Sequence, residues 1–147
     1  VAIHEGRRIV FRVENPARSL KDLLNTLEEI VGFGFTCEPI SLKEEFIHEA
    51  LSAIDNKKLN SLKVSGAIHG ARAVARMEIV AKDGLEPEKI ELLRSGNYIV
   101  DAASCEVTLK GVRGQLGFSK AGLCKISGPL SDYLLANLEK VLLVRLR

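Results

Sequence analysis

Strict alternation of residue types between positions 62 and 82 is the feature that most constrains the fold of this chain. Apolar or small residues recur there at every second position on both sides of Gly70, namely Leu62, Val64, Gly66, Ile68, Ala71, Ala73, Ala75, Met77, Ile79 and Ala81. A period of two places such residues on one face of a strand. A glycine between two such runs marks a turn, so residues 62–82 predict a β-hairpin with one apolar face.

A second stretch repeats this organisation further along the chain. Residues 99–110 and 115–126 predict another hairpin, with its turn at residues 111–114. A shift of 44 residues aligns Gly70 with Gly114 and Gly84 with Gly128, and a helical pattern follows each hairpin. We therefore expect a helix from Pro87 to Gly96, a final helix over residues 130–144, and a possible ββα tandem repeat in residues 62–147.

The N-terminal part has a different pattern. Residues 7–14 alternate, with Ile9, Phe11 and Val13 on one face, and predict a strand that could add to an edge of the sheet. A helix is expected to follow, with Ser19 as its cap and Gly32 at its end. A second helix is expected to begin at the capping box of residues 41–44 and to end near residues 55–58.

Together these elements predict an α+β fold. We expect an antiparallel sheet of four to five strands with helices mainly on one face. Residues 1–147 are predicted to form a single domain, in which residues 1–61 supply one strand and two helices and residues 62–147 supply two ββα units. A chain of 147 residues can bury a core without a metal ion or a disulfide bond.

Composition narrows the class of protein. With 46% hydrophobic and 27% charged residues, the sequence is typical of a globular domain and not of a disordered chain. No apolar run approaches the roughly 20 residues of a membrane span, and the first residues lack the apolar part of a signal peptide. We therefore expect a cytoplasmic location, and the single Gln beside many charged residues resembles the bias of thermophile proteins.

The residues expected to carry chemistry are few. Cys37, Cys105 and Cys124 include no Cys-x-x-Cys pair, so we expect reduced thiols and neither a metal nor a cofactor. Cys105 and Cys124 fall on apolar strand faces, which favours packing over catalysis. No nucleophile elbow is present, so whether the chain is an enzyme is left open, with a non-catalytic role preferred.

One candidate binding surface is the polar face of the predicted sheet. Residues 62–147 hold 13 basic and 9 acidic residues, a net charge of +4 that the overall value of +2 conceals. The candidate residues for binding an anion or a nucleic acid are His69, Arg72, Arg76, Lys110 and Arg113. A solvated sheet face is the simpler interpretation, and only Tyr98 is available there for stacking on bases.

The glycines Gly111, Gly114 and Gly117 are spaced like those of a phosphate-binding loop. Such a loop needs a helix after its glycines, whereas a strand is predicted here. The pattern therefore favours a hairpin turn or a β-bulge.

The last helix is apolar on more than one side. Its candidate interface residues are Tyr133, Leu135, Leu138, Leu142 and Leu143. The function that we expect first is therefore that of a non-catalytic interaction domain, which associates with itself or with a protein partner through this helix or a sheet edge. Binding of an anion or a nucleic acid by the cationic face, and a small enzyme or ligand-binding domain with a pocket between sheet and helices, are the alternatives.

Overall fold

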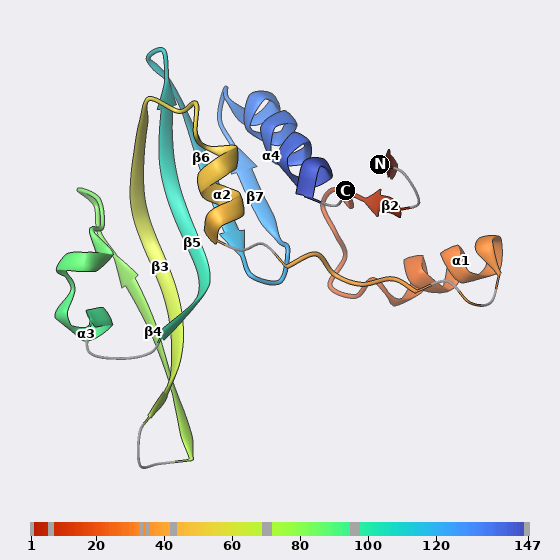
Figure 1. The fold of residues 1–147 in the computed structure, drawn as a ribbon, viewed down its shortest axis with the longest axis horizontal. Helices are drawn as coiled ribbons and strands as arrows, with labels where there is room; N and C mark the ends of the chain where they lie inside the picture. The colour runs from red at the N-terminus through yellow and green to blue at the C-terminus, as the bar shows by residue number, and fades with distance from the viewer. Residues whose placement is uncertain are drawn as a thin grey trace. The chain divides into compact units, whose positions relative to one another are not determined.

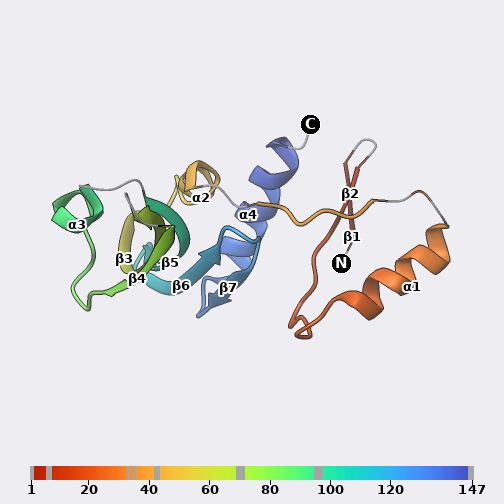
Figure 2. The same ribbon diagram turned by 90° about the horizontal axis from the view of Figure 1, so that it is seen from below.

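The computed structural model describes residues 2–5, 8–32, 34, 36–41, 44–68, 72–94 and 98–145. The chain divides into two compact units (Figures 1 and 2). The smaller unit comprises residues 1–39 and 143–147, and the larger unit comprises residues 40–142. The expectation of one domain over the whole chain stays a prediction.

The smaller unit begins with a two-stranded antiparallel hairpin of β1 (Ala2–Glu5) and β2 (Arg8–Phe11). Strand β2 lies within the predicted strand, but the expectation that it adds to the main sheet is wrong. The nearest strand in sequence is β1, and this local pairing satisfies the backbone of β2 instead. Val10 is buried, whereas Ile9 and Phe11 on the face predicted to be apolar are exposed.

Helix α1 (Lys21–Val31) follows, as the sequence predicts. The N-cap residue is Leu20 and not the predicted Ser19, although the Oγ atom of Ser19 accepts a hydrogen bond of 3.3 Å from the Lys21 amide. Gly32 ends the helix with φ +89°, and its amide donates to the Glu28 carbonyl at 2.8 Å. The expected helix and its terminal glycine are confirmed.

The larger unit is built on a five-stranded antiparallel sheet in the order β4-β3-β5-β6-β7. Its strands are β3 (Asn56–Ile68), β4 (Ala73–Val80), β5 (Tyr98–Leu109), β6 (Val112–Ser119) and β7 (Cys124–Ser127). The register confirms the alternation in the first hairpin, since Leu62 pairs with Ile79 and Val64 with Met77. The α+β fold with an antiparallel sheet is thereby confirmed.

Helices α2 (Glu44–Ala50) and α4 (Ser131–Arg145) cover one face of this sheet. The main core cluster joins the two helices to β5 and β6, and its buried residues are Phe46, Ile47, Ala50, Leu51, Ile54, Cys105, Val107, Leu116, Leu130, Leu134 and Leu138. Leu130, Leu134 and Leu138 recur every four residues, which is the spacing that keeps one helix face against a sheet.

A second cluster covers the same face at β3. Leu62, Val64 and Ala103 are buried there, and Leu85 and Leu93 pack against them. Leu85 precedes the short 3₁₀ helix η1 (Pro87–Lys89), and Leu93 lies in helix α3 (Glu91–Arg94). The expected helix from Pro87 is thus present only as these two short pieces. All helices of the larger unit in the described ranges thus lie on one side of the sheet.

Two boundaries differ from prediction because strand pairing decides them. Strand β3 begins at Asn56, where the sequence predicts the polar end of a helix; Lys57 and Lys58 instead pair with Val107 and Glu106. The predicted strand over residues 115–126 is two strands, β6 and β7, joined by a turn that includes Gly122 with φ +83°. The pairing of β3 with β5 joins residues that are distant in sequence, so a local pattern carries no information about it.

The β5–β6 turn is tighter than expected. Leu109 pairs with Val112, so only Lys110 and Gly111 form the loop, and both have positive φ (49° and 79°). Two such residues are typical of the hairpin turn that matches strand twist. Gly114 and Gly117 lie within β6, whose pairing with β5 shows no register shift, so their assignment to a turn or a bulge is wrong.

Candidate functional site

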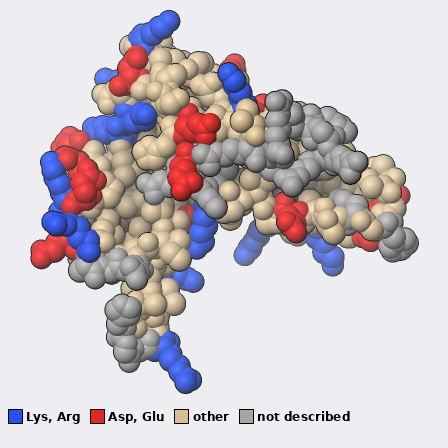
Figure 3. All heavy atoms as spheres, in the orientation of Figure 1, with Lys and Arg blue, Asp and Glu red and all other residues tan. Residues whose placement is uncertain are grey.

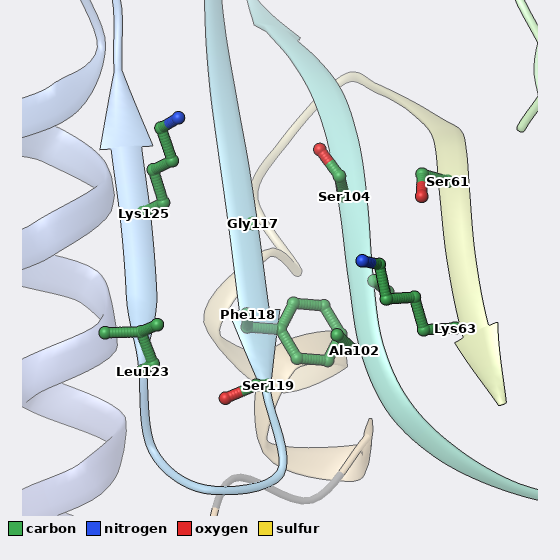
Figure 4. Close-up of a pocket in the computed structure, with 10 residues that line it drawn as sticks. Ser61, Lys63, Ala102, Ser104, Gly117, Phe118, Ser119, Leu123 and Lys125 are labelled. Carbon is green, nitrogen blue, oxygen red and sulfur yellow. The ribbon is translucent and has the colours of Figure 1, made fainter. Parts of the chain in front are cut away.

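The face of the sheet opposite the helices carries a shallow hollow of about 210 Å³ (Figure 4). The register places four lining residues in one row across the sheet, because Ser61 pairs with Ser104, Ser104 with Gly117, and Gly117 with Lys125. The neighbouring row contains Lys63, Ala102 and Ser119. The hollow therefore lies across β3, β5, β6 and β7, on the polar side of each strand.

Small residues and strand irregularities explain why the sheet is hollowed here. Gly117 has no side chain and Ala102 has only a methyl group, so the surface of the sheet is recessed at the centre of the two rows. Two register shifts in the β3–β5 pairing, at Leu59/Ser61 and Lys63/Val64, flank the same rows. Such bulges bend a strand and increase its twist locally.

Charges around the hollow are partly compensated. The Lys63 ammonium lies 3.3 Å from the Glu78 carboxylate, and Lys120 pairs with Asp101. Hydrogen bonds from Lys120 and Ser65, together with the charges of Lys120 and Arg76, hold the pKa of the Asp101 carboxyl below its ordinary value. Lys125 has no ion-pair partner in the described ranges, so it remains available to an external anion.

Four of the five residues predicted to bind an anion are described, and these four do not form one cluster. Arg76 lies on the polar face of β4, in the row of Ser65 and Ile99, and Arg72 is exposed just before this strand. Arg113 lies opposite Thr108, nine residues from Ile99 along β5, which is about 30 Å at the rise of a strand.

Lys110 lies apart from Arg72 and Arg76 as well. Lys110 is in the turn next to Arg113, and its amide donates to the Asp55 carboxylate at 2.8 Å. His69 lies outside the described residues. The hairpins of β3–β4 and β5–β6 are at opposite ends of the sheet in Figure 1, so these cations occupy two separate places.

The lysine on β7 was missed by the sequence analysis. Lys125 alternates with Cys124 and Ile126, which both pack against the core, so the same period of two could have placed it on the polar face. The prediction of one strand over residues 115–126 contains no pairing of Lys125 with Gly117, which the turn between β6 and β7 creates. In the view of Figure 3, acidic side chains occur beside basic ones over the larger unit, with no single basic patch.

The apolar residues of α4 have separate roles. Leu138 is buried in the main core and Leu142 packs against it, so these two predicted interface residues have partners in their own chain. Tyr133 is 37% exposed, and Leu135 and Leu143 are partly exposed, with Leu143 assigned to the smaller unit. Of the predicted interface residues in the larger unit, Tyr133 is therefore the one that is most open to solvent.

Two of the three cysteines are poorly suited to act as nucleophiles. Burial raises the pKa of the Cys105 and Cys124 thiols, which disfavours the reactive thiolate. Both pack in the core, as the strand alternation predicts, and Cys37 is exposed. Among the described residues no group of His, Cys, Asp or Glu side chains is arranged to hold a metal ion.

Comparison with known proteins adds no further constraint: no family model, curated protein or solved structure matches the chain. In the described ranges, every helix is too short or too polar to span a lipid bilayer.

Proposed function

We propose that this chain is a non-catalytic binding domain whose open sheet face binds a small organic anion in the hollow around Gly117. The observation that carries the proposal is the row that joins Ser61, Ser104, Gly117 and Lys125 across four strands. This row brings the hydroxyl groups of the two serines and the ammonium group of Lys125 to an open space, which the absence of a side chain at Gly117 leaves in the sheet surface.

The chemistry of the lining fits an anion with an apolar body. The methyl group of Ala102 and the side chain of Leu123 supply apolar contact, while Ser119 and Lys63 add donors. A carboxylate or phosphate that reaches Lys125 would form a charge-assisted hydrogen bond, which is stronger than one between neutral groups. The volume of about 210 Å³ lies below the usual range of ligand pockets, so the ligand would be small.

A nucleic acid is the less favoured ligand of this face. Proteins that bind single strands stack bases on exposed aromatic rings. Tyr98, the candidate for that role, packs against the second core cluster. Phe118 is on a strand that lines the hollow, but its side chain packs against the core on the other face. The cations that could follow a phosphate backbone occupy two ends of the sheet.

Association through α4 has less support than binding at the hollow, because Leu138 and Leu142 already pack in the core of their own chain. A cytoplasmic location and a thermophilic source remain predictions from composition.

The test is a thermal-shift screen of the full chain with small carboxylates and phosphate monoesters, each paired with a neutral analogue of the same shape. We expect anions, and not their neutral analogues, to raise the melting temperature at low salt and to lose this effect at high salt. Calorimetric titration then gives the dissociation constant of the best anion.

Two variants and a control locate the site. Lys125→Ala should weaken binding about tenfold, as expected for the loss of a charge-assisted hydrogen bond. Gly117→Val should abolish binding by filling the hollow, whereas Lys140→Ala, which removes an exposed charge from α4, should leave it unchanged. Failure of every anion to bind, or binding that Gly117→Val leaves intact, would show the proposal to be wrong.

A further inference from the structure

Strand β4 is an edge of the five-stranded sheet, and β3 is its only strand partner in the described ranges. The Ala81 amide donates to the Asn60 carbonyl at 2.9 Å, which fixes the direction of the backbone groups. In an antiparallel pair every second residue directs both its N–H and its C=O to the same neighbour. The residues at 73, 75, 77 and 79 therefore bond to β3, and those at 74, 76, 78 and 80 direct their backbone groups outwards.

Two of the features with which proteins block further strand pairing, a proline and a bulge, are absent from this edge. Strand β4 contains no proline, and its pairing with β3 has no register shift. Val74 is 63% exposed and Val80 is 69% exposed, and Arg76 and Glu78 are exposed between them. The outward backbone groups thus belong to four solvent-exposed residues in the order valine, arginine, glutamate, valine.

That order is complementary to itself when the direction is reversed. We propose that β4 pairs antiparallel with β4 of a second copy, about a two-fold axis at Met77. Arg76 then faces Glu78 of the second copy, and Val74 faces its Val80, each pair occurring twice by symmetry. The four pairs would exchange about eight main-chain hydrogen bonds and extend the sheet through the dimer.

The neighbouring registers are unfavourable, which makes this one specific. Since only residues with outward backbone groups can pair, the register can shift only in steps of two. A two-fold axis at Arg76 would place the two arginines opposite each other and Val74 opposite Glu78. An axis at Glu78 would oppose the two glutamates, and like charges directly opposite destabilise a strand pair.

The test is the size of the full chain by sedimentation equilibrium between about 5 and 500 µM, a range that covers dissociation constants of weak dimers. We expect the wild type to dimerise. Arg76→Glu and Glu78→Lys each place like charges at two symmetric pairs and should raise the dissociation constant at least about tenfold. Glu106→Lys, which makes the same change of charge on central strand β5, is the matched control and should leave it unchanged.

Restoring the complementarity distinguishes pairing from a general loss of stability. The double variant that combines both exchanges carries opposite charges at each pair again, so it should recover the dimer. An equimolar mixture of the two single variants also brings opposite charges together at both pairs, and it should form a heterodimer although neither protein alone associates. If a single variant fails to fold, Val80→Lys at a position that is 69% exposed disrupts the valine contact instead.

Amide hydrogen exchange reports the register directly. Dilution below the dissociation constant should speed exchange at Val74, Arg76, Glu78 and Val80, while the alternate residues bonded to β3 stay protected. A wild type that is monomeric at 500 µM overturns the proposal. A dimer that both single variants retain, or a double variant and a mixture that remain monomeric, overturns it as well.

Discussion

Gly114 on β6 lies directly beneath Leu130 at the start of α4, so that a methyl group on Gly114 would stand 2.9 Å from the Leu130 Cβ atom. Three residues away on the same strand, a methyl group on Gly117 would meet the Lys125 Cβ atom at an ordinary 3.7 Å. The two glycines lie on opposite faces: one permits the close approach of a helix and the other leaves a hollow.

The first prediction follows from this contrast. Gly114→Ala should destabilise the protein by about 1–3 kcal/mol, the usual range for overpacking, because α4 must shift away from β6. Gly117→Ala should be neutral or slightly stabilising, since its φ is not in the left-handed region and its surroundings accept a methyl group. Urea unfolding of both variants measures the difference; equal free energies of unfolding would contradict the packing described here.

Residues of α4 should separate into core and surface by their effect on stability. Leu138→Ala removes a side chain that is only 6% exposed and should cost about 2–5 kcal/mol. Tyr133→Ala, at 37% exposure, should cost far less. Denaturant unfolding checks both values, and a smaller loss for Leu138→Ala than for Tyr133→Ala would refute the orientation of the helix.

The three cysteines should differ in reactivity. Cys37 is exposed, whereas burial raises the pKa of Cys105 and Cys124. A chromogenic disulfide reagent at neutral pH should therefore modify one thiol per chain quickly and the other two at least about tenfold more slowly. Denaturant should make all three react alike, and Cys37→Ser should remove only the fast phase.

The carboxylate of Asp55 should stabilise the β5–β6 turn. It accepts a hydrogen bond of 2.8 Å from the amide of Lys110, whose φ is positive. Asp55→Ala should lower the free energy of unfolding by about 1 kcal/mol, the typical net value of one hydrogen bond. Asp55→Asn retains an acceptor oxygen and should lose less, so the reverse order in chemical denaturation would exclude this role.

Asp101 should contribute to stability only when it is ionised. Its pKa is lowered in the folded protein, chiefly by the hydrogen bond from Lys120, so its contribution is present above the pKa of the unfolded chain and is lost as the pH falls through the folded value. We expect wild type to be more stable than Asp101→Asn at neutral pH, with a difference that shrinks below about pH 4. Thermal melts across pH test this, and a difference that grows on acidification would contradict it.

The sequence by itself determined which side of each strand in the first hairpin faces the core and which side faces solvent. Alternation assigned Leu62 and Val64 to the buried side and Lys63 to the open side, because a period of two needs no knowledge of the partner strand. The last helix was not resolved in this way, because it is apolar on more than one side: Leu138, predicted as an interface residue, is buried in the core.

Only the tertiary structure decided which residues of different strands lie side by side across the sheet. Lys125 reaches the hollow because β7 pairs with β6, and Arg76 is separated from Arg113 because the two ends of a long sheet lie about 30 Å apart. The open edge at β4 likewise follows from strand order. Register and order depend on contacts between residues far apart in the chain, whose energies no local pattern contains.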